Sequence, residues 1–121
     1  MIARRLPIRV VLLAAMVAVL TACGGVDQSA LRAQVGSEPV VLLSTAWCGY
    51  CRKLRSDLQN WGVAYTELDV ERSEEGQRAY RMVGGRGVPI LLIADQVVHG
   101  YSPQRARALL GESGIAVTNI D

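Results

Sequence analysis

The pair Cys48 and Cys51 constrains the fold of this chain more than any other feature, because of where the two cysteines stand. Before them lies Val40–Ser44 (VVLLS), a short β-branched and apolar run that is typical of a buried strand. After them, Leu54 and Leu58 recur at the four-residue spacing of an amphipathic helix. The pair therefore falls at the carboxyl end of a strand and opens a helix, which is where open α/β sheets place their chemistry.

The rest of the pattern predicts one small α/β domain. Strands are predicted over residues 40–44, 63–70, 88–94 and 96–99. Helices are predicted over 51–60, over 73–83 with Ser73 as its cap, and over 103–110, opened by Ser102 and Pro103. The order β-α-β-α-β-β-α predicts a four-stranded mixed sheet flanked by three helices. The first strand should lie beside both the second and the third, and the last two should form an antiparallel hairpin.

The first 22 residues are typical of an export signal and are excluded from the fold. Three arginines stand in the first nine positions, and Val10–Leu20 is an apolar run of eleven residues. A membrane-spanning helix needs about 20 such residues, whereas a signal peptide needs roughly 7–15. The run ends in Leu-Thr-Ala-Cys at Cys23, which resembles the lipobox of bacterial lipoproteins. We predict a lipoprotein signal peptide at residues 1–22 and lipidation of Cys23; an ordinary secretory signal cleaved near Ala22 stays open.

This interpretation divides the chain into four parts. Residues 23–38 would be the lipidated cysteine and a polar tether, with one helical turn at Ala30–Gln34. Residues 39–112 would form the domain, and residues 113–121 a short tail. A lipid on Cys23 would attach an exported domain to the membrane of a bacterial envelope, facing the periplasm or the cell exterior.

Charge argues against a nucleic-acid partner. The formal net charge of +2 includes the three arginines of the signal. From residue 23 onward, ten Lys and Arg stand against eleven Asp and Glu. A nearly neutral domain has no general attraction for a phosphate backbone, and a chain with no Phe offers few rings for base stacking. We expect a monomer that binds no nucleic acid.

Cysteine counting points to chemistry at the pair. If Cys23 carries lipid, Cys48 and Cys51 are the only cysteines left, and an exported compartment permits a disulfide between them. A bridge that spans three residues closes too small a loop to add much stability. The pair is therefore expected to be reactive rather than architectural.

Over residues 39–112 the chain resembles the thioredoxin superfamily, and glutaredoxins most closely. The resemblance is carried by Trp47-Cys48-Gly49-Tyr50-Cys51 after the first strand, by Gly87-Val88-Pro89 before the third, and by Gly100 after the hairpin. It implies a thioredoxin-like fold, thiol–disulfide oxidoreductase activity and a cis bond between Val88 and Pro89. It also implies substrate-binding roles for Trp47, Gly49, Tyr50, Val88 and Pro89, although simple packing stays open for Tyr50.

The predicted mechanism assigns different roles to the two cysteines. Cys48 should stand at the start of the helix, where unpaired N–H groups and the helix dipole lower the pKa of a thiol. It would attack a protein or low-molecular-weight disulfide, and Cys51 would resolve the mixed disulfide. The resemblance favours a disulfide reductase, which needs an unidentified electron donor. No bound cofactor is predicted beyond the redox-active disulfide itself.

Three departures from the related families affect these predictions. Thr45 stands where glutaredoxins usually carry Lys, and His99–Gln104 lacks the acidic pair with which they usually bind glutathione. Glutathione is therefore left open as a cosubstrate, and the chain looks more like the redoxins that thioredoxin-type reductases supply. Val40–Ser44 carries no buried acid of the thioredoxin kind, so the proton of Cys51 should pass to water or a weaker group.

Two other functions are compatible with a single C-x-x-C. One C-x-x-C supplies two thiolates where structural zinc takes four ligands, and His99 is the only histidine, so no metal site is assigned. A lipoprotein handling Cu(I) through the two soft thiolates stays open, as does one whose C-x-x-C is an inert clip. We interpret His99 as solvated or packed, Trp61 and Tyr65 as packing residues, and the acids Glu71, Glu74 and Glu75 as a solvated helix face.

Overall fold

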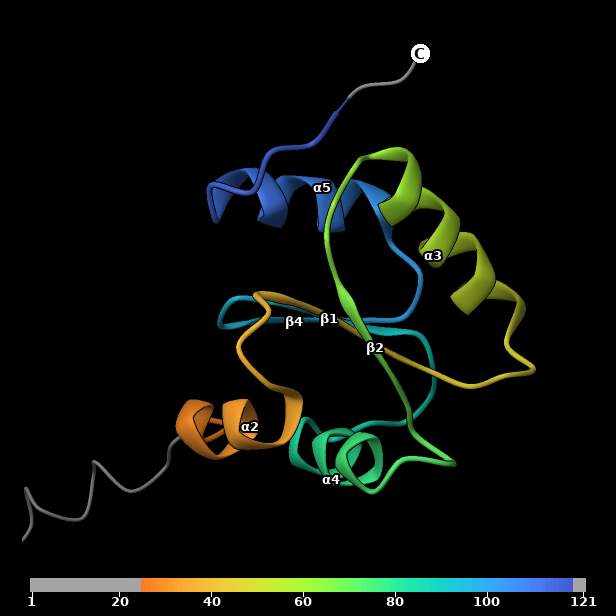
Figure 1. Cartoon of the computed structure of the whole chain (residues 1–121), viewed down its shortest axis with the longest axis vertical. Helices are drawn as coiled ribbons and strands as arrows, with labels where there is room; N and C mark the ends of the chain where they lie inside the picture. The colour runs from red at the N-terminus through yellow and green to blue at the C-terminus, as the bar shows by residue number, and fades with distance from the viewer. Residues whose placement is uncertain (1–24, 119–121) are drawn as a thin grey trace, which may run out of the picture.

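The computed structural model describes residues 25–118, in which one four-stranded sheet lies between two layers of helices (Figure 1). Helices α2 and α4 cover one face of the sheet, and α3 and α5 cover the other. None of the helices in this range is long and apolar enough to cross a bilayer. In chain order the elements are α2 (Gln28–Val35), β1 (Val40–Ser44), α3 (Gly49–Asn60), β2 (Thr66–Asp69), α4 (Glu74–Met82), β3 (Ile90–Ile93), β4 (Gln96–His99) and α5 (Pro103–Glu112).

The sheet has the predicted neighbours, in the order β2-β1-β3-β4. β1 pairs in parallel with β2 and antiparallel with β3, so that Leu43 lies beside Leu68 on one side and Ile90 on the other. β3 and β4 form the expected antiparallel hairpin. The thioredoxin-like fold class is confirmed. β1 and β4 have the predicted bounds, whereas β2 and β3 are shorter than the runs that predicted them.

β1 is buried on both faces and divides the core in two. Val40 and Leu42 pack into a cluster with residues of α3 and α5, while Val41 and Leu43 pack into a cluster with residues of α2 and α4. A strand covered on both sides needs apolar residues at every position rather than at alternate ones. This explains the continuous VVLLS run, and it places the end of β1 rigidly at the centre of the molecule.

The structure corrects the prediction of a tether over residues 23–38, because α2 is an eight-residue helix that belongs to the domain. Leu31 and Val35 are 2% and 4% exposed, and the Asp27 side chain caps the helix by accepting a hydrogen bond from the N–H of Ala30. Arg32 donates to the carbonyls of Glu38 and Ala94. The described residues therefore hold four helices, not three. The predicted signal peptide and Cys23 lie outside the described residues.

Ser73 and Ser102 were both predicted to cap a helix, and the structure confirms the side-chain cap only for Ser73, at the start of α4. The hydroxyl of Ser73 accepts a hydrogen bond from the N–H of Gly76 at 3.0 Å, as expected of a cap. Ser102 makes no such bond through its side chain; instead Pro103 occupies the first turn of α5, where a missing N–H costs nothing. Beyond α5, Ile115 and Val117 pack against the core, so the first part of the predicted tail is attached to the domain.

Candidate active site

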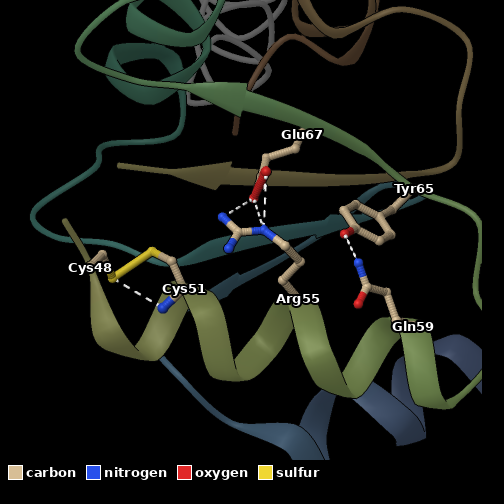
Figure 2. A network of polar contacts seen from close by, with 6 residues as sticks. All are labelled: Cys48, Cys51, Arg55, Gln59, Tyr65 and Glu67. Atoms are coloured by element: carbon tan, nitrogen blue, oxygen red, sulfur yellow. Dashed lines mark hydrogen bonds and ion pairs between the residues drawn. A yellow bond between two sulfur atoms is a disulfide. The ribbon is translucent and has the colours of Figure 1, made fainter. Parts of the chain in front are cut away.

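Cys48 and Cys51 form a disulfide at the start of α3 (Figure 2). Cys48 is the cap residue of the helix, and its Sγ accepts a hydrogen bond from the N–H of Cys51 at 3.1 Å. Cys48 is 5% exposed and Cys51 is fully buried, so Cys51 is the less accessible sulfur, as predicted. The N–H of Cys51, one of the orphan donors of the first helical turn, therefore points toward the sulfur of Cys48, where it stabilises negative charge.

The segment before β3 reaches the same sulfur. The Val88–Pro89 bond is cis, as the resemblance implied. The carbonyl oxygen of Val88 lies 3.8 Å from Sγ of Cys48, and Pro89 is buried beneath it. The carbonyl of Pro89 accepts a hydrogen bond from the N–H of Gly100, which joins this segment to the end of β4. The structure thus brings together the two separate motifs that the sequence singled out.

Trp47 stands beside the disulfide and is 68% exposed. Its indole Nε1–H donates to the carboxylate of Glu71 at 2.9 Å. Glu71 is exposed, as predicted, but it precedes α4 rather than lying on a helix face, and it is the hydrogen-bond partner of an aromatic side chain next to the disulfide. The carboxylate of Asp69 accepts hydrogen bonds from the backbone N–H groups of Glu71 and Arg72, which fixes this turn. Glu71 follows the strand that pairs in parallel with β1, and this was the one signal that could have placed it at the site.

Tyr50, the second residue of α3, is exposed and packs on a neighbouring ring, and its role in substrate binding stays a prediction. It is 59% exposed, and its ring stacks on Tyr101 with 5.5 Å between the ring centroids. The hydroxyl of Tyr101 donates to Oδ2 of Asp57 at 2.7 Å. This hydrogen bond to a carboxylate, helped by partial burial, raises the pKa of Tyr101 above its ordinary value. Sequence reasoning assigned no role to Tyr101, because only the fold brings it to α3.

Side chains on α3 anchor this helix to β2 and to the segment before it, as Figure 2 shows. Arg55 donates through Nε and Nη2 to the carboxylate of Glu67, at 2.8 and 2.6 Å from Oε1. The hydrogen bond to Glu67 raises the pKa of Arg55. One turn further on, the amide of Gln59 donates to the hydroxyl of Tyr65 at 3.4 Å. These bonds keep the helix that carries both cysteines in register with the sheet.

Two hollows lie on either side of the segment before Pro89. One, of about 490 Å³, is lined by Trp47, Glu71 and Val88 and by Thr45, whose buried hydroxyl has no hydrogen-bond partner among the described residues. The other, of about 320 Å³, is lined by Val88 and by His99, which is exposed. Within residues 25–118 no three His, Cys, Asp or Glu side chains are grouped so as to hold a metal ion.

The comparisons with known proteins agree with this geometry. The family model described as Glutaredoxin matches residues 40–98. A glutaredoxin of Pseudomonas aeruginosa is 32% identical over 75 residues, which cover 61% of this chain and 89% of that protein. The chain belongs to the glutaredoxin family. A protein of Mycobacterium tuberculosis that is also named as a glutaredoxin is 34% identical over 58 residues, covering 46% of this chain and 69% of its own length.

Solved structures support the same fold at lower identity. A buckwheat glutaredoxin, whose structure is described as a complex with glutathione, superimposes with a TM-score of 0.57 at 23% identity, covering 74% of this chain and 92% of the other. The Escherichia coli NrdH-redoxin, described as a glutaredoxin-like protein with a thioredoxin-like activity profile, gives a TM-score of 0.53 at 23% identity, covering 58% and 92%. The chain is thus a glutaredoxin-like redox protein with the C-x-x-C pair Cys48 and Cys51.

Proposed function

We propose that this glutaredoxin-family protein is a thiol–disulfide oxidoreductase that reduces disulfides, with Cys48 as the nucleophile and Cys51 as the resolving thiol. One observation carries the assignment. The sulfur of Cys48 caps α3 and accepts the N–H of Cys51, so that charge on this sulfur is stabilised by the helix. Cys51 is buried one turn into the helix, within bonding distance of Cys48 and away from an incoming substrate.

The reaction proceeds in two exchanges that balance. The thiolate of Cys48 attacks one sulfur of the substrate disulfide, forms a mixed disulfide and expels the other sulfur, which takes up a proton. Cys51 then loses its proton to water and attacks Cys48, which closes the Cys48–Cys51 disulfide and releases the second substrate thiol. Two electrons pass to the substrate, so an electron donor must reduce the pair again before the next turnover.

The residues around the pair suit an extended polypeptide as substrate. The backbone of Val88 lies beside Cys48 and can pair with a substrate strand, in the manner of strand addition. Trp47 and Tyr50 are both largely exposed close to the pair, and Gly49 presents no side chain next to the nucleophile. We therefore propose protein disulfides as the main substrate class, with low-molecular-weight disulfides as further substrates.

The place of action is also a proposal. The apolar run Val10–Leu20, followed by Thr21, Ala22 and Cys23, supports an exported, lipid-anchored protein of a bacterial envelope. We propose further that it acts as a monomer and, because the chain from residue 23 onward is nearly neutral, that it binds no nucleic acid. The electron donor is unassigned. Thr45 and His99–Gln104 depart from the usual glutathione-binding residues, and for this reason glutathione is one donor to be tested rather than the assigned one.

Two substitutions test the roles of the cysteines. The full-length chain is prepared with Cys23→Ser in every sample, so that no third thiol competes, and is reacted in reduced form with a peptide disulfide. Cys51→Ser should accumulate a stable mixed disulfide that mass spectrometry locates on Cys48, and Cys48→Ser should not react. If the Cys48→Ser variant exchanged as fast as the parent, the assigned roles would be wrong. If the parent itself were unreactive, the pair would be an inert clip.

A further inference from the structure

Two consecutive cations lie on the solvent side of α3, next to the redox pair. Arg52 and Lys53 are exposed, and together with Gly49, Tyr50 and Ser56 they line an open depression of about 550 Å³. This depression is separate from the hollows beside Val88, since it is formed by α3 alone. The proposed function uses Gly49 and Tyr50 but assigns no role to Arg52 or Lys53.

Lys53 is held in place by aromatic rings. Its Nζ lies 5.7 Å from the ring centroid of Tyr50 and 5.7 Å from that of Tyr101. Each such contact at an exposed site contributes about 0.5–1 kcal/mol. Tyr101 is fixed in turn by its hydrogen bond to Asp57. The cation is therefore positioned before any partner arrives, and a partner does not have to order it.

Neither cation has a countercharge in the described part of the chain. The ion pairs within residues 25–118 engage Arg55 and Arg78, and no carboxylate lies within 4.0 Å of Arg52 or Lys53. The carboxylate that faces this region is that of Asp57, one turn further along α3, and one of its oxygens accepts the hydroxyl of Tyr101. Two positive charges thus remain available to an outside group.

We infer that the surface formed by Tyr50, Arg52, Lys53 and Tyr101, here called the α3 ledge, docks acidic side chains of the protein whose disulfide Cys48 attacks. The inference rests on the proposed function. Arg52 and Lys53 lie four and five residues after Cys48, or roughly 6–8 Å along the helix axis. An extended substrate advances about 3.3 Å per residue. Acidic residues two or three positions from the reacting cysteine would therefore meet the ledge.

The composition of the ledge favours a protein partner. Tyrosine and arginine are the residue types that carry much of the binding energy in protein interfaces. Here two tyrosine rings lie beside the Lys53 cation, and Arg52 precedes it on the same helix. Charge complementarity then selects acidic over neutral sequences and raises the rate of encounter more than the final affinity.

The test compares two peptide disulfides that differ only in charge. Both carry the same chromogenic leaving thiol; one has two Glu, the other two Gln, at the second and third positions from the cysteine. The full-length reduced chain should react with the acidic peptide about two- to fivefold faster at low salt, the range of an exposed ion pair. The ratio should fall as salt is added and approach one near 1 M, where the Debye length is about 3 Å and shorter than the separation of a docked ion pair. Taking a ratio within one protein cancels any effect on the thiol of Cys48.

Matched variants locate the effect. Lys53→Gln should lower the ratio clearly and Arg52→Gln with Lys53→Gln should bring it close to one, while Arg81→Gln, which removes an exposed cation of α4 on the other face of the sheet, should leave it unchanged. The inference about the α3 ledge is wrong if the ratio is unaltered in Lys53→Gln, or if the parent reduces both peptides at the same rate. In either case the proposed disulfide-reductase function still stands. Failure to reduce either peptide overturns both. If Lys53→Gln instead weakens binding to phosphatidylglycerol vesicles and leaves the ratio intact, the ledge faces a membrane and the inference is wrong.

Discussion

Replacing Gly76 with alanine should destabilise this domain, although the same change stabilises most helices. Gly76 lies in the first turn of α4, and a Cβ there would stand 2.5 Å from the carbonyl oxygen and 2.9 Å from the carbonyl carbon of Asp69. Both atoms belong to the backbone at the end of β2, so relief requires a shift of the helix. Overpacking of this kind costs about 1–3 kcal/mol, whereas replacing a helical glycine by alanine gains at most about 1 kcal/mol. With the middle of the first range and the full gain of the second, the balance is a loss of about 1 kcal/mol.

Urea unfolding of the oxidised chain, followed by circular dichroism, measures this loss directly. Gly111→Ala is the matched control, because Gly111 is also helical and a Cβ there meets nothing within 4 Å. This control should gain about 0.4–1 kcal/mol. Since the turn that follows Asp69 carries Glu71, the fluorescence of Trp47 should also change in Gly76→Ala. A Gly76→Ala variant as stable as the parent would refute the close contact between α4 and β2.

Three further outcomes follow from the packing and the polar contacts. Leu31→Ala should cost about 2–5 kcal/mol in the same unfolding assay, because Leu31 is buried in the core; a loss near zero would mean that α2 is a tether after all. Glu67→Gln should cost no more than about 1 kcal/mol, because its ion pair with Arg55 is one-third exposed, and a loss of several kcal/mol would contradict that exposure. Because the pKa of Tyr101 is raised in the folded chain, the unfolded chain loses this proton first as the pH rises. The free energy of unfolding of the parent should therefore fall as the pH rises above about 10, and that of Tyr101→Phe should fall less. Equal slopes of unfolding free energy against pH in the two proteins would exclude the hydrogen bond to Asp57.

The sheet could be predicted from the sequence because its signals are local. β1 is an unbroken apolar run, and the hairpin of β3 and β4 needs only a short turn. α2 could not be predicted in the same way. Its segment is mostly polar, with Leu31 and Val35 as its buried residues. An eight-residue helix is not stable alone, and α2 is held by the core and by the bonds from Arg32 to carbonyls that are distant in the sequence.

The candidate active site also contains residues that local motifs predicted and contacts that they did not. Cys48, Cys51, Val88 and Pro89 stand in short motifs, and the structure brings them together as expected. The hydrogen-bond partners of Trp47 and Tyr101 could not be predicted. Glu71 is 24 residues from Trp47, and Asp57 is 44 residues from Tyr101, so neither hydrogen bond leaves a periodic or local pattern in the chain. Polar contacts of this kind depend on loop geometry, which sequence patterns constrain least.

The acidity of the Cys48 thiol tests the central claim most directly. It is measured in the reduced full-length chain with Cys23→Ser and Cys51→Ser, by following the ultraviolet absorbance of the thiolate as the pH is raised. Serine keeps the backbone N–H at position 51 that donates to the sulfur of Cys48. The position of this sulfur at the start of α3 predicts a pKa well below that of a free cysteine. A pKa at or above that of free cysteine would show that burial outweighs the helix, and Cys48 could not be the nucleophile.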